Sequence, residues 1–291
     1  MCRLFGFRSV INSQVHSSLV HADNALISQS LDHPDGWGVA YYRENTPHLI
    51  KSTDRAVDDQ IFHMISGVVS SQTVIAHIRK ATQGKLSILN SHPFQYGKWV
   101  FAHNGNLKDF DCYKNELMKY IDEDLRRFVL GTTDSEVIFY LLISLIKKKH
   151  KLTNTTPSFQ TLKESTQELC DIICKFTGPL YGGLESNPAE SHLTFILTTG
   201  KTMIAFNGGL QLKYSTYKTK CSESETCAFY GENCVNPSDK GHQIKHLLFS
   251  SEELQGENIW LRMKNGEMIG VDEEMLLHQS QLEVEFLKQP S

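Results

Sequence analysis

The order in which two hydrophobic periodicities follow one another most constrains how this 291-residue chain can fold. The first hundred residues alternate mainly as strands do, the middle has the 3.6-residue period of helices, and the last third returns to strand-like runs. Strands are expected at Cys2–Arg8, Trp37–Tyr42, Thr73–Ile78, Trp99–Ala102, Leu193–Thr198, Thr202–Phe206, Leu212–Tyr217, His246–Ser250 and Met268–Val271. Helices are expected at Val15–Ser30, Asp58–Ile65, Lys108–Lys119, Asp134–Lys147 and Ser158–Phe176.

Strands, then helices, then strands again, without a regular βαβ rhythm of about 30 residues, predict a layered α+β fold with mostly antiparallel sheets. A doubly wound nucleotide-binding fold is disfavoured. Gly178–His192 is expected to be a loop, and Asn265-Gly266 is a strong signal for a β-hairpin turn. The length allows one large domain or two average ones. No linker-like stretch divides the chain cleanly, and the order of the five motifs given below favours a single domain over residues 1–291.

Composition limits the partners of the chain. Its 29 basic and 33 acidic residues leave a net charge of −4, so no global positive field would hold it on nucleic acid. The longest mostly apolar run, Val137–Ile146, is far shorter than the ~20 residues that cross a bilayer, and the N-terminus lacks the pattern of a signal peptide. Seven cysteines, an odd number, favour reduced thiols and a cytoplasmic location.

Cys2 directly follows the initiator methionine, and removal of Met1 would make it the N-terminal residue. Its α-amine, with a reference pKa of about 7.7–8.0, could then accept the proton of its own thiol, whose reference pKa is about 8.5. One residue would thus supply both nucleophile and base, and no separate histidine would be required. The alternative is a cysteine buried in the first strand.

Asn104-Gly105 follows the apolar strand that ends at Ala102. An amide N–H₂ group and a backbone N–H that converge on one point form an oxyanion hole, worth roughly 3–4 kcal/mol per donor in acyl transfer. The alternative is a simple Asn-Gly turn.

Arg79 lies at the end of a predicted strand, where a guanidinium could hold a carboxylate by two hydrogen bonds. Asp134 lies where a helix begins and could pair with an ammonium group. Together they suit recognition of a free α-amino acid. The alternatives are a surface charge for Arg79 and helix capping by Thr132, Thr133 or Asp134.

Five motifs occur in a characteristic order. They are Met1-Cys2-Arg3-Leu4-Phe5-Gly6, Asp35-Gly36-Trp37-Gly38, His77-Ile78-Arg79 with Thr82, His103-Asn104-Gly105-Asn106 and Thr133-Asp134-Ser135-Glu136. This set resembles the class II, N-terminal nucleophile type of glutamine amidotransferase, and is most similar to its stand-alone branch, which includes γ-glutamyl hydrolases of ergothioneine synthesis and glutathione breakdown. The motif core covers residues 2–136. A helical middle at about 134–176 and C-terminal strands at about 193–272 extend the resemblance less sharply.

The resemblance implies a four-layer αββα sandwich, in which helical layers enclose two mostly antiparallel sheets. It also implies that Cys2 attacks the γ-carboxamide carbon of the substrate, while Asn104 and the N–H of Gly105 stabilise the oxyanion. Water then releases glutamate from a γ-glutamyl thioester. Neither a metal nor an organic cofactor is expected.

The same resemblance assigns the substrate-binding residues. Arg79, helped by Thr82, would bind the α-carboxylate of the substrate, and Asp134 would bind its α-ammonium group. Gly38 would leave room beside the nucleophile. His77 and His103 are expected to support neighbouring strands or the surroundings of the site.

The other cysteines and the lysine-rich segment give weaker signals of a functional site. Cys170 and Cys174 lie four residues apart on a predicted helix and are expected to be packed thiols. A second group lacks the close cysteine pairs of structural zinc sites, so zinc is disfavoured there; its members are Cys221, Cys227, Cys234, His242 and His246. Lys147–Lys151 is expected to be a solvated helix end, with a partner surface as the alternative.

The predicted function is cleavage of the γ-amide bond of glutamine or of a γ-glutamyl compound, with release of glutamate and ammonia or an amine. A separate acceptor or synthetase subunit is one possible partner, because the length leaves little room for a second domain and no phosphate-binding loop motif occurs. The alternative function is a non-catalytic binding or regulatory subunit of a larger amidotransferase or peptidase complex.

Overall fold

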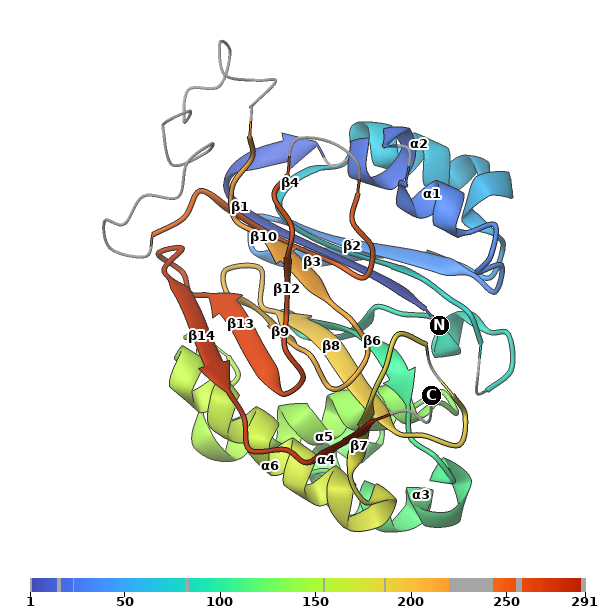
Figure 1. Cartoon of the computed structure of the whole chain (residues 1–291), viewed down its shortest axis with the longest axis vertical. Coiled ribbons are helices and arrows are strands. Elements are labelled where there is room, and N and C mark those ends of the chain that lie inside the picture. The colour runs from blue at the N-terminus through green and yellow to red at the C-terminus, as the bar shows by residue number, and fades with distance from the viewer. Residues whose placement is uncertain are drawn as a thin grey trace.

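The protein is described here from a computed structural model that covers residues 2–14, 17–22, 24–81, 84–153, 155–185, 187–219, 243–254 and 258–288. Two β-sheets lie face to face, and helices cover the outer face of each, so that the layers follow as helix, sheet, sheet, helix (Figure 1). The predicted four-layer αββα architecture is confirmed.

The first sheet has seven strands, and every pair of neighbours in it is antiparallel. In spatial order they are β12 (Leu261–Arg262), β10 (Lys213–Ser215), β11 (His246–Ser250), β1 (Arg3–Gln14), β4 (Ser70–Ile78), β2 (Trp37–Arg43) and β3 (Thr46–Ser52). The N-terminal strand β1 therefore lies inside the sheet, between β11 and β4.

The second sheet has six antiparallel strands. In spatial order they are β14 (Leu277–Gln281), β13 (Glu267–Val271), β9 (Met203–Phe206), β8 (His192–Thr198), β6 (Trp99–Asn106) and β5 (Phe94–Tyr96). A separate parallel pair joins β7 (Leu180–Gly182) to β15 (Phe286–Lys288).

Helices from two parts of the chain form the outer layers (Figure 1). The helices α1 (Leu26–Gln29) and α2 (Gln60–Val68) lie on the seven-stranded sheet, with short helical turns at Ser17–His21 and Ala56–Asp58. Those on the six-stranded side are α3 (Phe110–Met118), α4 (Glu123–Arg126), α5 (Asp134–Lys149) and α6 (Phe159–Thr177). A further 3₁₀ turn, Ile88–Asn90, precedes β5.

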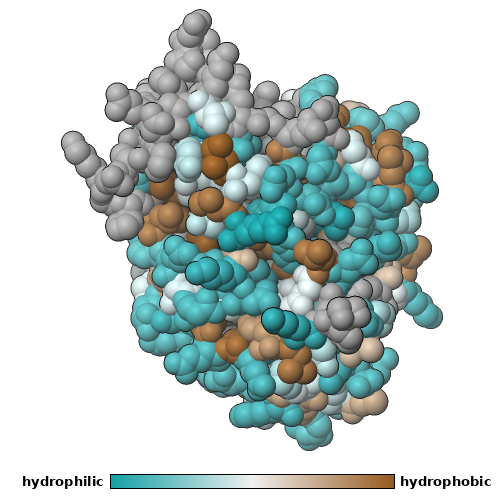
Figure 2. Space-filling view, viewed as in Figure 1, coloured by the Kyte–Doolittle hydropathy of each residue, from teal (hydrophilic) through white to brown (hydrophobic). Residues whose placement is uncertain are grey.

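Three apolar cores fill the spaces between these layers. Strand alternation divides them: Leu4 of β1 faces the other sheet, whereas its neighbour Phe5 faces α1 and α2. The helix α5 is buried from Asp134 through Ile146 and forms the centre of the third core. The surface seen in Figure 2 is mostly hydrophilic, with hydrophobic side chains in small groups among polar ones. The cores hold most of the large apolar side chains and fix the sheet ends in place.

Most predicted elements are present, and three predictions are wrong. The helix at Val15–Ser30 is replaced by a π-helical turn and the short α1, because Ala25 adopts an extended backbone, with φ −63° and ψ 159°, before α1. The predicted loop Gly178–His192 contains β7 and the first residue of β8. Asn265-Gly266 forms no hairpin, because β12 before it and β13 after it belong to different sheets.

Candidate active site

A small cleft lies where β1 begins and β4 and β6 end, beside the N-terminus of α5. It brings together Cys2, Arg79, Gly105 and Asp134, which are spread over more than 130 positions of the sequence. The described residues that line it are Cys2, Arg79, Lys80, Ala81, Asn90, His92, His103, Gly105, Thr133, Asp134 and Ser135.

Strand alternation explains why polar residues gather at this end of the molecule. Cys2, Gly38, His77 and Asn104 each lie two positions from a residue of the apolar core between the sheets, and therefore on the same face of their strands. Those core residues are Leu4, Ala40, Ile75 and Ala102, in the same order. The space between the sheets is thus apolar along its length and polar where it opens at the cleft.

The thiol of Cys2 is half buried and contacts the backbone of Lys80. The N–H of Lys80 donates to Sγ at 3.4 Å, and Sγ also lies 3.4 Å from the carbonyl oxygen of the same residue. Burial raises the pKa of the Cys2 thiol, while the backbone hydrogen bond with Lys80 acts in the opposite direction. A nucleophilic thiolate at neutral pH therefore requires a base close to the sulfur.

Asn104 and Gly105 are strand residues of β6, paired with Thr194 and Leu193 of β8, so the alternative of an Asn-Gly turn is wrong. Asn104 is 1% exposed, and neither its amide nitrogen nor its amide oxygen has a hydrogen-bond partner among the described residues. A buried amide without partners is costly and rare in folded proteins. A ligand oxygen that accepted a hydrogen bond from the amide nitrogen of Asn104 would relieve the part of that cost that comes from the nitrogen.

Asp134 is the first residue of α5, and Thr133 occupies the N-cap position without a side-chain capping bond. The carboxylate of Asp134 accepts hydrogen bonds at 2.7 Å from the backbone N–H groups of Leu107 and Ser135. Burial raises the pKa of Asp134 to about 6. Its carboxylate therefore lines the cleft as a buried group that a cation would stabilise.

Arg79 follows β4 directly and is 3% exposed, so the alternative of a surface charge is wrong. Its backbone N–H donates to the carbonyl oxygen of Gly36 at 2.8 Å, and its Nη1 lies 3.5 Å from the carbonyl oxygen of Lys85. Burial lowers the pKa of the guanidinium, while negative charge on the sulfur of Cys2, when it is ionised, and on the carboxylate of Asp35 acts in the opposite direction. The cleft therefore contains one basic and one acidic buried side chain.

A half-buried thiol and a pair of oppositely charged side chains thus meet at one cleft, next to a buried amide that has no partner among the described residues. The family model described as "Glutamine amidotransferases class-II" matches residues 1–177. The chain belongs to this family.

Relatives of this amidotransferase confirm the family and the fold. The "Probable glutamine amidotransferase DUG3" of Saccharomyces cerevisiae is 27% identical over 311 residues, which cover 95% of this chain and 83% of that protein. A glutamine aminotransferase class-II domain protein from Silicibacter pomeroyi superimposes with a TM-score of 0.62 at 17% identity, over 97% of this chain and 98% of the other. The glutamine phosphoribosylpyrophosphate amidotransferase of Bacillus subtilis has a TM-score of 0.58 at 17% identity, over 96% of this chain but 49% of its own.

Three predicted site residues are not among the described residues that line the amidotransferase cleft, namely Asn104, Thr82 and Gly38. Asn104 precedes the lining residue Gly105 on β6. Thr82 falls outside the described residues. Gly38 faces the chain at His92: a Cβ at this position would lie 2.1 Å from the carbonyl oxygen of His92 and 2.9 Å from Pro93. The glycine thus makes room for the segment that carries His92 into the cleft, and its effect on the nucleophile is indirect.

Sequence reasoning missed Asn90 and His92, which both line the cleft. The amide of Asn90 donates to the carbonyl oxygen of Lys85 at 3.0 Å and accepts from the N–H of Thr132 at 2.8 Å, so it joins two loops beside Asp134. His92 is buried, and its ring lies 4.2 Å from that of His77 between centroids. The run of polar residues Asn90–His92, between the predicted strands Thr73–Ile78 and Trp99–Ala102, was the available signal.

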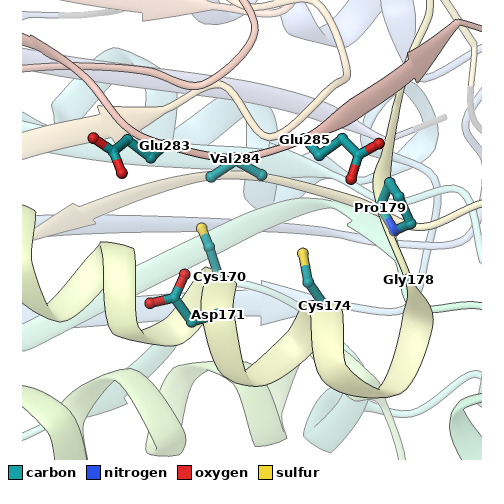
Figure 3. A pocket seen from close by; sticks show the side chains of 8 residues that line it. All are labelled: Cys170, Asp171, Cys174, Gly178, Pro179, Glu283, Val284 and Glu285. Atoms are coloured by element: carbon teal, nitrogen blue, oxygen red, sulfur yellow. The ribbon is translucent and has the colours of Figure 1, made fainter.

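Cys170 and Cys174 form a second hollow away from the cleft. Both thiols point from α6 toward the segment Glu283–Glu285 (Figure 3). Burial raises the pKa of both thiols, that of Cys174 to about 11, so the prediction of packed thiols agrees with their surroundings.

The remaining predictions concern the second cysteine group, a metal site, a membrane span and the lysine-rich end of α5. Cys221, Cys227, Cys234 and His242 lie outside the described residues. Within the described ranges, no group of three or more metal-binding side chains could hold an ion, and no helix is long and apolar enough to cross a membrane. Lys147 forms ion pairs with Asp122 and Asp124, and Lys149 pairs with Glu168, as expected for a solvated helix end.

Proposed function

We propose that this amidotransferase cleaves the γ-amide bond of glutamine or of a γ-glutamyl compound, with Cys2 as the nucleophile. The observation that carries the proposal is the cleft itself, which unites the thiol of Cys2, the residue Gly105 and two buried side chains of opposite charge. Asn104 supplies the second oxyanion donor. Its side chain lies on the face of β6 that packs against the core between the sheets, and its amide has no partner among the described residues.

The charged pair orients the substrate in this proposal. Arg79 binds the α-carboxylate, with Thr82 as a helper, and Asp134 binds the α-ammonium group. Fixing both ends of the amino acid head brings the γ-carbonyl carbon to the sulfur in a reactive position, which is a large part of the rate gain in such reactions. Gly38 contributes by admitting the loop that carries His92.

The reaction begins after removal of Met1, which leaves Cys2 with a free α-amine. The amine takes the proton of the thiol, and the thiolate attacks the γ-carbonyl carbon. Negative charge on the carbonyl oxygen is stabilised by Asn104 and Gly105. The carbon–nitrogen bond breaks, the leaving nitrogen receives the proton from the α-ammonium group, and a γ-glutamyl thioester remains. Water, deprotonated by the same amine, then releases glutamate and regenerates the thiol.

The acceptor of the nitrogen is the second part of the proposal. We propose that residues 1–291 form one amidotransferase domain, because strands beyond residue 177 pair directly with β1 and β6. Ammonia then passes to a separate acceptor or synthetase subunit, or the amine is simply released by hydrolysis. The described chain offers no metal site for these steps, and none of them needs a cofactor. A cytoplasmic setting would keep the thiol of Cys2 reduced.

Glutamate release from glutamine, glutathione and other γ-glutamyl amides tests the proposal. Wild-type protein should release glutamate from at least one of them, and Cys2→Ala should abolish release. Cys112→Ala, which removes an exposed free thiol outside the cleft, is the matched control and should retain full activity.

Mass spectrometry of the intact protein should show loss of Met1 in the active form. Full activity in Cys2→Ala would disprove the mechanism. Binding of glutamine without glutamate release by protein that has lost Met1 would instead support the non-catalytic regulatory subunit.

A further inference from the structure

A buried chain of hydrogen bonds runs from Asp134 to the backbone of β8. The hydroxyl of Ser135 lies 2.9 Å from Nδ1 of His103 and 3.3 Å from Oδ1 of Asp134. On the other side of the ring, Nε2 of His103 lies 3.2 Å from the carbonyl oxygen of His192. His103 is 1% exposed, and Asp134 and Ser135 are also buried. The partners in this series of hydrogen bonds determine which atom of each pair carries the proton.

The carbonyl oxygen of His192 can only accept, so Nε2 of His103 carries the ring proton. Burial lowers the pKa of His103 to about 4, so the ring is neutral near pH 7 and Nδ1 holds a lone pair. Nδ1 must then accept the proton of the Ser135 hydroxyl. That hydroxyl has one proton, which is therefore not donated to Oδ1 of Asp134.

Gly105 is the residue that permits this arrangement. A Cβ on Gly105 would lie 2.2 Å from the carbonyl oxygen of His192 and 2.6 Å from Nε2 of His103, so any side chain would separate the two. The backbone N–H of Gly105 does not require a glycine, because other residues carry the same donor. The contact between His103 and His192 does require one.

We propose that His103 is a positioning residue for the α-ammonium site. By accepting the Ser135 hydroxyl proton, His103 keeps that hydroxyl from donating to Asp134, so the carboxylate oxygen keeps that lone pair for the substrate. Without the acceptor, the hydroxyl turns to Oδ1 of Asp134 and competes with the ammonium group for the same oxygen. This inference rests on the proposed binding of the α-ammonium group by Asp134.

Two substrates that differ only in the α-amine test the inference. Glutaramate is glutamine without its α-amine, so it does not use the ammonium site. In His103→Phe, KM for glutamine should rise about 5- to 10-fold, the size of one hydrogen bond, while KM for glutaramate should change little. His103→Asn, whose side-chain oxygen can accept from Ser135, should restore KM for glutamine. In a Ser135→Ala background, His103→Phe should no longer change the ratio of the two KM values.

His246→Phe is the matched control, because it removes another buried imidazole, on β11 outside the cleft lining. It should leave the ratio of the two KM values unchanged. Thermal melting checks that each variant is folded. If His103→Phe does not fold, ¹⁵N NMR of the histidine rings in the wild-type protein decides: a proton on Nε2 of His103 supports the inference, and a proton on Nδ1 overturns it.

Asp134→Ala separates this inference from the proposed function. If Asp134→Ala does not change the ratio of the two KM values, the assignment of Asp134 is wrong. If Asp134→Ala raises the ratio but His103→Phe leaves it unchanged, only the role of His103 is wrong. Equal increases in both KM values in His103→Phe would show a purely structural role and would also overturn the inference.

Discussion

Two hollows in this amidotransferase hold cysteine thiols, and they differ in what surrounds the sulfur. Beside Cys2 lie the N–H of Lys80 and the guanidinium of Arg79, which favour a negative sulfur. Beside Cys174 lie the carboxylates of Asp171 and Glu285, which oppose one. Both thiols are partly buried. Charge and hydrogen-bond donors around the thiol, rather than burial, distinguish a site for chemistry from a packed residue.

The largest expected effect comes from the amide of Asn104, which has no partner among the described residues and lies next to Gly105 of the Cys2 hollow. Asn104→Ala should lower kcat for glutamine roughly 100- to 1,000-fold, because it removes one oxyanion donor. Its melting temperature should change little, since the amide makes no hydrogen bond among the described residues. Steady-state kinetics and thermal melting measure the two effects.

Asn106→Ala is the matched control on the same strand. The amide of Asn106 donates to the carbonyl oxygen of Glu190 at 2.7 Å, so its loss should lower the melting temperature more than kcat. An Asn104→Ala enzyme with wild-type kcat would remove Asn104 from the oxyanion hole.

The carboxyl group of Asp134 in the Cys2 hollow should make the preference for glutamine over glutaramate depend on pH. Asp134, with its pKa raised to about 6, is protonated below that pH and then cannot pair with an ammonium group. The ratio of kcat/KM for glutamine to that for glutaramate should therefore fall up to about tenfold per pH unit below pH 6. Measuring the ratio cancels the titration of groups that serve both substrates.

Asp134→Asn should make that ratio independent of pH between pH 5 and 8. Burial holds the pKa of His33 and of His103 at about 4 and that of His77 at about 3, so these rings do not titrate in this range. A pH dependence that persists in Asp134→Asn would assign the titration to another group.

Alkylation should show the opposite charge surroundings of the two hollows directly. Iodoacetate is an anion and iodoacetamide is neutral, so the ratio of their rates reports the local charge. This ratio should be about 3- to 10-fold higher at Cys2, beside Arg79, than at Cys174, beside Asp171 and Glu285. Peptide mapping by mass spectrometry measures both sites, and the exposed Cys112 serves as an internal reference. Equal ratios at Cys2 and Cys174 would contradict the comparison.

The smallest effect is expected from the second hollow. Cys174→Ala should lower the free energy of unfolding by about 1 kcal/mol through lost packing and should leave glutamate release unchanged. Chemical denaturation and the glutamate assay measure these. A large loss of activity would show that the α6 hollow contributes to the reaction.

The sequence predicted the layers and the residues of the cleft better than it predicted the turns. Asn104 and Gly105 were found through a motif, but their place inside β6 depends on pairing with β8, some 90 residues later. Asn265-Gly266 has ideal hairpin chemistry, yet its flanking strands find better partners in different sheets. Local signals cannot show such distant pairing.

The role of Gly38 could not be predicted from the sequence either, because the need for a glycine arises from the carbonyl oxygen of His92 on another segment. The same holds for Gly105, whose missing side chain leaves space for His103 and His192. Backbone contacts between distant segments set these requirements, and no pattern within either segment records them.

The interleaved strand order has a consequence for dissecting the molecule. The strand β6, which carries the proposed oxyanion donors, is flanked by β8. The strand β1, which follows the proposed nucleophile Cys2, is flanked by β11, and both β8 and β11 come from beyond residue 177. A fragment that ends after α6 would contain every proposed site residue but would leave one edge of each of these two strands open. Activity should therefore return only when the two pieces are mixed, which makes this fold a natural candidate for a split enzyme assembled by fragment complementation.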